Sequence, residues 1–134
     1  MSYALSTTVN RPFAETLEAT RSALSDQGFG VLTEIDIAAT LKAKLDVDIA
    51  SQVILGACRP PLAQAALEAE PSIGLLLPCN VVVRAVSDDS TLVEAMDPAI
   101  MVTVTRNEKL TDVAADARER LRNTLAALDG TSND

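Results

Sequence analysis

A stripe of apolar residues near the C-terminal end constrains the fold more than any other feature of the sequence. The stripe repeats every three or four positions, which is the period of an α-helix that buries one face. It predicts a helix over residues 107–128 that ends at Gly130. The apolar positions of the stripe are Leu110, Val113, Ala114, Ala117, Leu121, Leu125 and Leu128. Such a helix needs an apolar surface to cover, so the rest of the chain must provide one.

A second long helix is predicted over residues 11–27. Asn10 is its expected N-cap, Pro12 suits the first turn, and Gly28 is the expected stop. Two shorter helices are expected further along the chain. One begins after the pair Pro60–Pro61 and covers residues 62–70, and the other covers residues 37–45.

Segments of strand character separate the helices. Their apolar residues either alternate or form short continuous runs, as in exposed and buried strands. The predicted strands are residues 3–9, 29–35, 51–58, 73–77, 80–86, 91–96 and 100–105. Strands grouped together between two long helices predict an α+β fold, with a curved antiparallel sheet and both long helices on one face. Adjacent apolar residues in 75–77 and 81–83 need cover on both sides, so we expect a homodimer.

Composition excludes several classes of function. The chain has 134 residues, which predicts one domain over residues 1–130 and a disordered tail at 131–134. A net charge of −8 and only three aromatic residues argue against nucleic-acid binding. No apolar run is long enough for a membrane span, and no signal peptide opens the chain, so we expect a cytoplasmic protein. Without histidine, the chain lacks the residues for Ser–His–Asp triads and imidazole metal sites.

Residues 54–83 read ILGACRPPLAQAALEAEPSIGLLLPCNVVV. This stretch resembles the domain of unknown function family 302, whose hallmark is an ILGAC-type strand, a turn, a short alanine-rich helix and then GLLLPCNVVV. Weaker similarities extend over nearly the whole chain, at Pro12–Phe13, Gly28–Phe29, residues 40–42 and Asp97–Pro98. The chain departs from the family pattern at Arg59, where asparagine is common.

The resemblance implies a fold and an assembly. Members of this family resemble the TATA-binding-protein type of fold, with the element order β-α-β-β-β-β-α, and they tend to form dimers. The resemblance implies no DNA binding, because one fold can serve many functions. It also implies no particular reaction.

Five residues are candidates for ligand binding. Cys58 stands at a strand end before a helix that starts with two prolines, beside the cation Arg59, and both features stabilise a thiolate. Cys79 follows Pro78 at an irregular point of the sheet, and Asn80 follows it. Lys42 is placed either to meet an anionic ligand or to pair with Asp46. For each residue the alternative is a purely structural role, since free cysteines are commonly buried as small apolar groups.

These observations favour a homodimeric domain that binds a small molecule and performs no catalysis. We expect no catalytic residues, no cofactor and no metal. One alternative is a thiol redox or Cu(I)-binding protein that uses Cys58 and Cys79, since soft thiolates suit Cu(I). The other alternative is a structural dimer module that acts through a protein partner.

Overall fold

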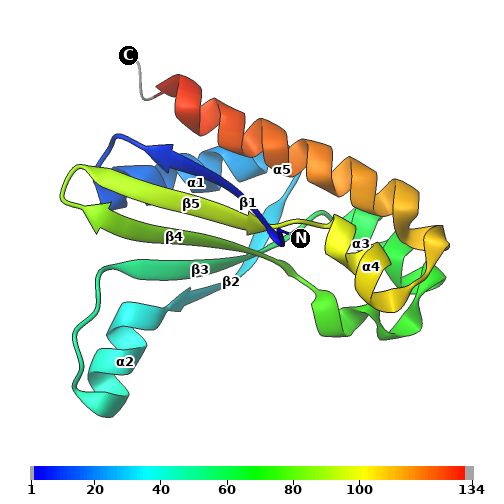
Figure 1. Cartoon of the computed structure of the whole chain (residues 1–134), viewed down its shortest axis with the longest axis horizontal. Helices are drawn as coiled ribbons and strands as arrows, with labels where there is room; N and C mark the ends of the chain where they lie inside the picture. The colour runs from blue at the N-terminus through cyan, green and yellow to red at the C-terminus, as the bar shows by residue number, and fades with distance from the viewer. Residues whose placement is uncertain (1, 132–134) are drawn as a thin grey trace.

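The computed structural model describes residues 2–131, and its elements alternate between sheet and helices (Figure 1). Within these residues, a mixed α+β architecture follows the predicted order β-α-β-β-β-β-α, with short helices inserted. The elements are β1 (Ala4–Val9), α1 (Phe13–Asp26), β2 (Gly30–Asp36), α2 (Ile37–Leu45), β3 (Gln52–Cys58), α3 (Pro60–Ala69), the 3-10 helix η1 (Pro71–Leu76), β4 (Cys79–Ser87), β5 (Ser90–Met96), α4 (Ala99–Thr105), the 3-10 helix η2 (Glu108–Leu110) and α5 (Thr111–Thr131).

In the described part of the chain, five strands form one antiparallel sheet in the order β1-β5-β4-β3-β2. Neighbouring rows of side chains across the sheet point to opposite faces, because successive residues of a strand point to opposite sides. One row is buried and contains Leu5, Ala95, Val81 and Leu55. The neighbouring row, on the other face, contains Ser6, Glu94, Val82, Ile54 and Ile35.

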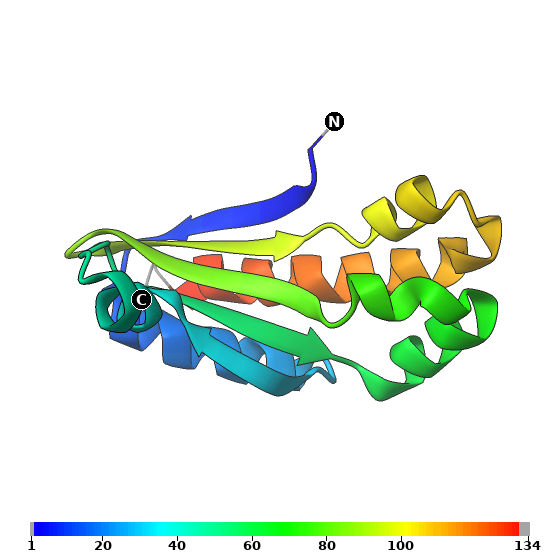
Figure 2. The same ribbon diagram turned by 90° about the horizontal axis from the view of Figure 1, so that it is seen from below.

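Helices α1 and α5 cover one face of the sheet and leave the other face without helices (Figures 1 and 2). The main core lies between these two layers, where Leu24, Leu55, Val83 and Val93 are fully buried and Leu121 is 1% exposed. The predicted two-layer arrangement with both long helices on one face is therefore confirmed. The stripe of α5 supplies Leu121, Leu125 and Leu128 to this core.

A second apolar cluster extends the molecule beyond one end of the sheet. It contains Ala66 of α3, Ile73 of η1, Met101 of α4, Leu110 of η2 and Ala114 of α5, each at most 3% exposed. The first turns of α5 thus serve this cluster, while its later turns cover the sheet. Two helical regions far apart in sequence, residues 60–76 and 99–110, lie side by side here (Figures 1 and 2).

Gly28 ends α1, as predicted. Its φ of 86° is in the left-handed region, which glycine adopts without steric cost. The backbone N–H of Gly28 donates to Ser25 and that of Phe29 donates to Leu24, which is the Schellman pattern of a helix end. The motif turns the chain directly into β2 and buries Phe29 against the core.

Four predictions about local structure were wrong. Residues 73–77 lie mostly in η1 instead of a strand, because Pro71 starts a tight helical turn that buries Ile73 and leaves Leu75 exposed. Residues 100–105 form α4 instead of the last strand, because the Asp97 carboxylate accepts the N–H of Ala99 and begins a helix.

The other two concern helix ends. Asn10 does not cap α1, whose N-cap is Pro12, without a side-chain cap hydrogen bond. Helix α5 continues through Gly130 to Thr131, so the expected tail begins within the helix, and its residues 132–134 lie outside the described residues.

Gly56 of β3 offers a direct test of close packing on the open face. A Cβ at this position would overlap the Thr33 hydroxyl of β2 and lie 2.9 Å from Cγ of Pro78. We expect Gly56→Ala to lower the free energy of unfolding by about 1–3 kcal/mol, because the added methyl overpacks a filled site. Urea denaturation measures this change.

Gly74→Ala is the matched control, because nothing lies within 4 Å of a Cβ built at Gly74. Its free energy of unfolding should stay within about 0.5 kcal/mol of the wild-type value. Adding Thr33→Ala to Gly56→Ala should restore part of the loss. Equal stability of the two glycine variants would contradict the packing described here.

Candidate functional site

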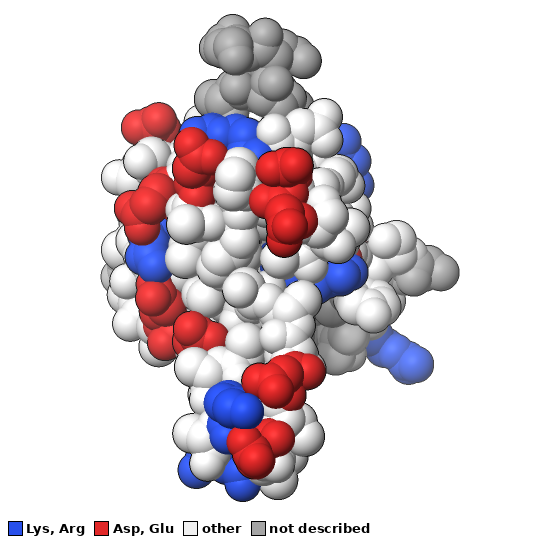
Figure 3. All heavy atoms as spheres, turned by 90° about the vertical axis from the view of Figure 1, so that its left-hand side faces the viewer, with Lys and Arg blue, Asp and Glu red and all other residues white. Residues whose placement is uncertain are grey.

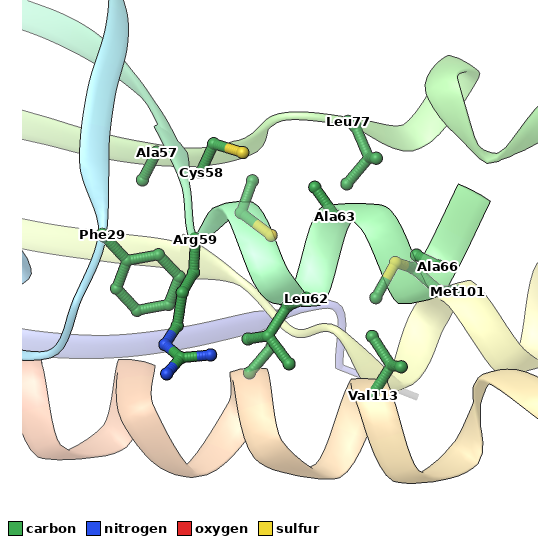
Figure 4. Close-up of a pocket in the computed structure, with 12 residues that line it drawn as sticks. Phe29, Ala57, Cys58, Arg59, Leu62, Ala63, Ala66, Leu77, Met101 and Val113 are labelled. Atoms are coloured by element: carbon green, nitrogen blue, oxygen red, sulfur yellow. The ribbon is translucent and has the colours of Figure 1, made fainter. Parts of the chain in front are cut away.

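A small apolar cavity lies where the sheet meets its helical extension (Figure 4). Its volume is about 20 Å³, which is room for a single water-sized group. Its lining residues come from β3, α3, β4, α4, α5 and the chain around them. They are Phe29, Ala57, Cys58, Arg59, Leu62, Ala63, Ala66, Leu77, Cys79, Met101, Val113 and Ala117. Three of the five predicted site residues, Cys58, Arg59 and Cys79, therefore share one cavity.

The pairing of β3 with β4 brings the two cysteines together. Ala57 lies opposite Cys79 in the register, so Cys58 is one position further along β3, and both cysteines line the cavity at this end of the pair. Cys58 ends β3, and the chain turns at Arg59 into α3, whose first residues are Pro60 and Pro61. Both cysteines are free, as predicted; Cys79 is buried, and Cys58 is half-buried.

Arg59 is the charged residue in the cavity wall. It is the N-cap residue of α3, and its side chain lies beside Phe29 (Figure 4). A Cβ at Gly28 would lie 3.0 Å from Nε of Arg59, so the glycine leaves room for this side chain. Gly28 therefore ends α1 and also admits the guanidinium group to the edge of the cavity.

Met101 is a cavity residue that the sequence analysis missed. It lies on α4, is 2% exposed and brings a third sulfur to the wall. The segment around it, residues 100–105, was predicted as a strand that follows a turn at Asp97–Pro98. The signal that could have placed Met101 is the pair Asp97–Pro98, which starts α4.

Burial controls the chemistry of Cys79. Desolvation raises the pKa of the Cys79 thiol, and the nearby charge of Cys58 adds to the effect, so that the pKa reaches about 11. Raising the pKa favours the neutral thiol, which is a poor nucleophile. Cys79 is therefore protonated at neutral pH.

The other two candidates lie elsewhere. Asn80 is exposed on the open face of the sheet, in a shallow depression that it shares with Tyr3, Val82 and Glu94. Lys42 is on α2, which projects from the sheet, and its Nζ is 2.9 Å from Oδ1 of Asp46. Figure 3 shows charges of both signs close together on this end of the molecule. The structure thus brings neither residue to the cysteine cavity.

Acidic residues near the end of β5 are held in ion pairs. Asp97 is 8% exposed, and both of its carboxylate oxygens lie 3.1 Å from Nε of Arg118. Through this pair Arg118 anchors α5 to the start of α4. Glu94 pairs with Arg84 across the open face at 3.4 Å. Glu94 and Asp97 therefore pair with different arginines and do not form a pair of carboxylates with each other.

Residues 2–131 contain neither a membrane-spanning helix nor a cluster of metal-ligating residues. No helix there has the length and apolar character needed to cross a membrane. No group of three or more histidine, cysteine, aspartate or glutamate residues in that range is arranged to hold a metal ion. A metal site in the described structure would have to recruit other ligands.

The fold and cavity define a class: two-layer α+β proteins with an open antiparallel sheet and a helical extension at one end. The crystal structure of an uncharacterized conserved protein DUF302 from Bacillus stearothermophilus has the same fold, with a TM-score of 0.87 and 28% sequence identity. The similarity covers 96% of this chain and 99% of that chain. The family model "Domain of unknown function DUF302" matches residues 5–128, so the chain belongs to this family. No curated protein matches the chain.

The difference between the two cysteines predicts different reactivity. In the native protein at about pH 8, an alkylating reagent should modify Cys58 and leave Cys79 intact, because Cys79 is buried and its pKa is about 11. Peptide mass spectrometry with Cys58→Ser and Cys79→Ser as controls measures each site. Cys79 should react as the pH approaches its pKa or after denaturation. Equal rates for both cysteines at about pH 8 would contradict this environment.

Proposed function

We propose that this chain is a homodimeric binding domain without catalysis, and that its ligand site is the cysteine-lined cavity. The observation that carries the proposal is that Cys58 at the end of β3, Arg59 at the start of α3 and Cys79 at the start of β4 line one apolar cavity. Two polarisable thiols and one cation in an apolar wall are typical of a site that recognises a small group by a few placed contacts.

The arrangement of charged groups supports binding over catalysis. A general acid or base must reach the reacting group directly or through one water. The carboxylates of Glu94 and Asp97 are instead in ion pairs with Arg84 and Arg118, away from the cavity wall. The high pKa of Cys79 also opposes a role as a nucleophile at neutral pH.

The open face of the sheet supports a second copy of this chain as the partner. Its apolar residues Ile35, Ile54 and Val82 lie in one row across three strands, next to Glu94. Arg84 and Glu94 give the same face one charge of each sign, so a two-fold axis that passes between these two residues places Arg84 of each copy near Glu94 of the other. The face is thus complementary to itself in both apolar area and charge.

The projecting α2 extends this surface. Helix α2 and the segment after it stand out on the side of the open face (Figures 1 and 2). Leu45, Val47 and Ile49 are each at least 42% exposed there. Exposed apolar residues in a continuous region are typical of a protein interface, and in a dimer these would flank the partner's sheet.

We place this domain in the cytoplasm and expect no nucleic acid among its partners. Reducing compartments keep thiols free, and both cysteines are free. The net charge of −8 opposes binding to phosphate backbones.

Val82→Lys tests the dimer surface. Val82 lies opposite Glu94 in the register, so a lysine gains an ion-pair partner within the monomer while placing a charge in the proposed interface. We expect a shift from dimer to monomer in light scattering coupled to gel filtration. Val104→Lys is the control, because Val104 is 62% exposed on α4, away from the sheet. A wild-type monomer at all concentrations, or a dimeric Val82→Lys, would overturn the proposed interface.

Filling the cavity tests the ligand site. Ala63 lines the cavity, so Ala63→Leu places a larger side chain in the cavity wall. Gln64→Leu is the control, because Gln64 is exposed and does not line the cavity. A thermal-shift screen of metal ions and small organic compounds is run on the wild type and both variants. A ligand of the cavity should stabilise the wild type and Gln64→Leu but not Ala63→Leu. Stabilisation of all three by every hit, or of none, would overturn the proposed site.

A further inference from the structure

Arg59 is a half-buried cation that the rest of the described structure leaves without a counter-charge. Within residues 2–131, its guanidinium group takes part in no ion pair and donates no hydrogen bond. Acidic residues outnumber basic ones by 19 to 11 in this chain, so carboxylates are abundant. Asp116, which precedes the cavity residue Ala117 on α5, pairs with Arg120 instead. Because burial of an unpaired charge is costly, the Arg59 side chain indicates a place for an anion from outside the chain.

The Arg59 side chain is held in position on two sides. Phe29 is 5% exposed, and its ring lies beside the Arg59 side chain (Figure 4), where an aromatic ring favours a guanidinium group. On another side, a Cβ at Gly28 would lie 3.0 Å from Nε and 3.5 Å from Cδ of Arg59, so the backbone of Gly28 packs closely there. A side chain fixed in this way loses little further freedom when it binds an anion.

Helix α3, which begins after Arg59, adds no second donor for an anion. Pro60 and Pro61 have no backbone N–H, and the N–H groups of Leu62 and Ala63 donate to the Arg59 carbonyl. The other side chains of the cavity lining are apolar or thiols. One guanidinium group is too little for the charge and the several oxygens of a phosphate. A carboxylate has one charge and two oxygens in a plane, which match the fork of a guanidinium group.

The cavity beyond Arg59 has room for a short apolar tail. Its volume of about 20 Å³ holds one methyl-sized group. Figure 4 shows the guanidinium group at the end of the cavity away from the Cys58 sulfur. Burial raises the pKa of Cys79, so that thiol stays neutral and adds no charge to the cavity wall at neutral pH. The cavity is therefore cationic at its edge and apolar inside.

We infer that the cavity binds a short-chain monocarboxylate of about the size of propionate. Arg59 binds the two carboxylate oxygens at the edge, and the terminal methyl group fills the apolar part beside Ala63. This inference rests on the proposed function, because it names the class of ligand for the same cavity. No bond is formed or broken in the ligand.

A titration followed by NMR tests the inference. Protein labelled with ¹⁵N is titrated with sodium propionate at constant ionic strength, and amide shifts report the affinity and the site. We expect shifts at Phe29, Cys58 and Ala63, around the cavity. Propionamide has the same shape without the charge and should cause none, and inorganic phosphate should also fail. Acetate should bind about fourfold more weakly than propionate, because it buries one methylene fewer. Trimethylacetate should be excluded by the small volume.

Variants of Arg59 test the role of the guanidinium group. Arg59→Gln should weaken propionate binding by about 10- to 100-fold, the usual effect of losing hydrogen bonds to a charged group. Arg59→Lys keeps the charge without the fork and should have an intermediate affinity. Arg122→Gln is the matched control: it removes the same charge from an exposed position of α5 outside the cavity lining, and it should bind as the wild type does. Circular dichroism of every variant checks that it is folded, and the comparison of propionate with propionamide needs no variant.

The possible failures can be told apart. Propionate binding that survives in Arg59→Gln, or equal binding of propionate with propionamide or phosphate, would overturn the carboxylate site. If propionate does not bind but another compound stabilises the wild type and not Ala63→Leu, the inference falls and the proposed cavity function stands. If neither propionate nor any compound acts through the cavity, both fall.

Discussion

The burial of one sheet face under α1 and α5 is the constraint on which the other features depend. Because strand side chains alternate between the two faces, every second row of side chains points to the covered face and must be apolar. The rows through Leu55 and Val83 are such buried apolar rows. The opposite rows are then left without helices. The first turns of α5 extend past the end of the strands (Figure 1), and they need a second cluster around Met101. The cavity lies at this junction of the two clusters.

The candidate site therefore lies where the main core under the sheet meets the second apolar cluster. The strand register determines that Cys58 and Cys79 are neighbours, and the turn into α3 brings Arg59 to the same place. Gly28 connects this corner to α1, because the residue that ends the helix also leaves space for the Arg59 side chain. The left-handed backbone of Gly28 and the presence of Arg59 in the cavity wall therefore depend on each other.

Short-range signals in the sequence predicted most of the fold. The period of α5, the stop at Gly28 and the prolines after Cys58 depend on neighbouring residues, and the structure confirms each of them. Long-range contacts were harder to predict. The register between β3 and β4 and the packing of Met101 involve residues distant in sequence, and the segment that holds Met101 was wrongly predicted as a strand. Asp97–Pro98 suggested a turn, and the hydrogen bond from the Ala99 N–H to the Asp97 carboxylate shows why a helix starts there.

The position of β1 has a consequence for how the chain is made. β1 is an edge strand whose only neighbour in the described sheet is β5, so its Val9 pairs with Thr91 and its Ala4 with Met96. A ribosome releases the N-terminal end first, yet this strand has no partner until β5 has emerged. Of the five strands in the described sheet, β1 is thus synthesised first and is among the last to pair. Until then, α1 has an incomplete sheet to cover, and the core closes only when both ends of the chain are present.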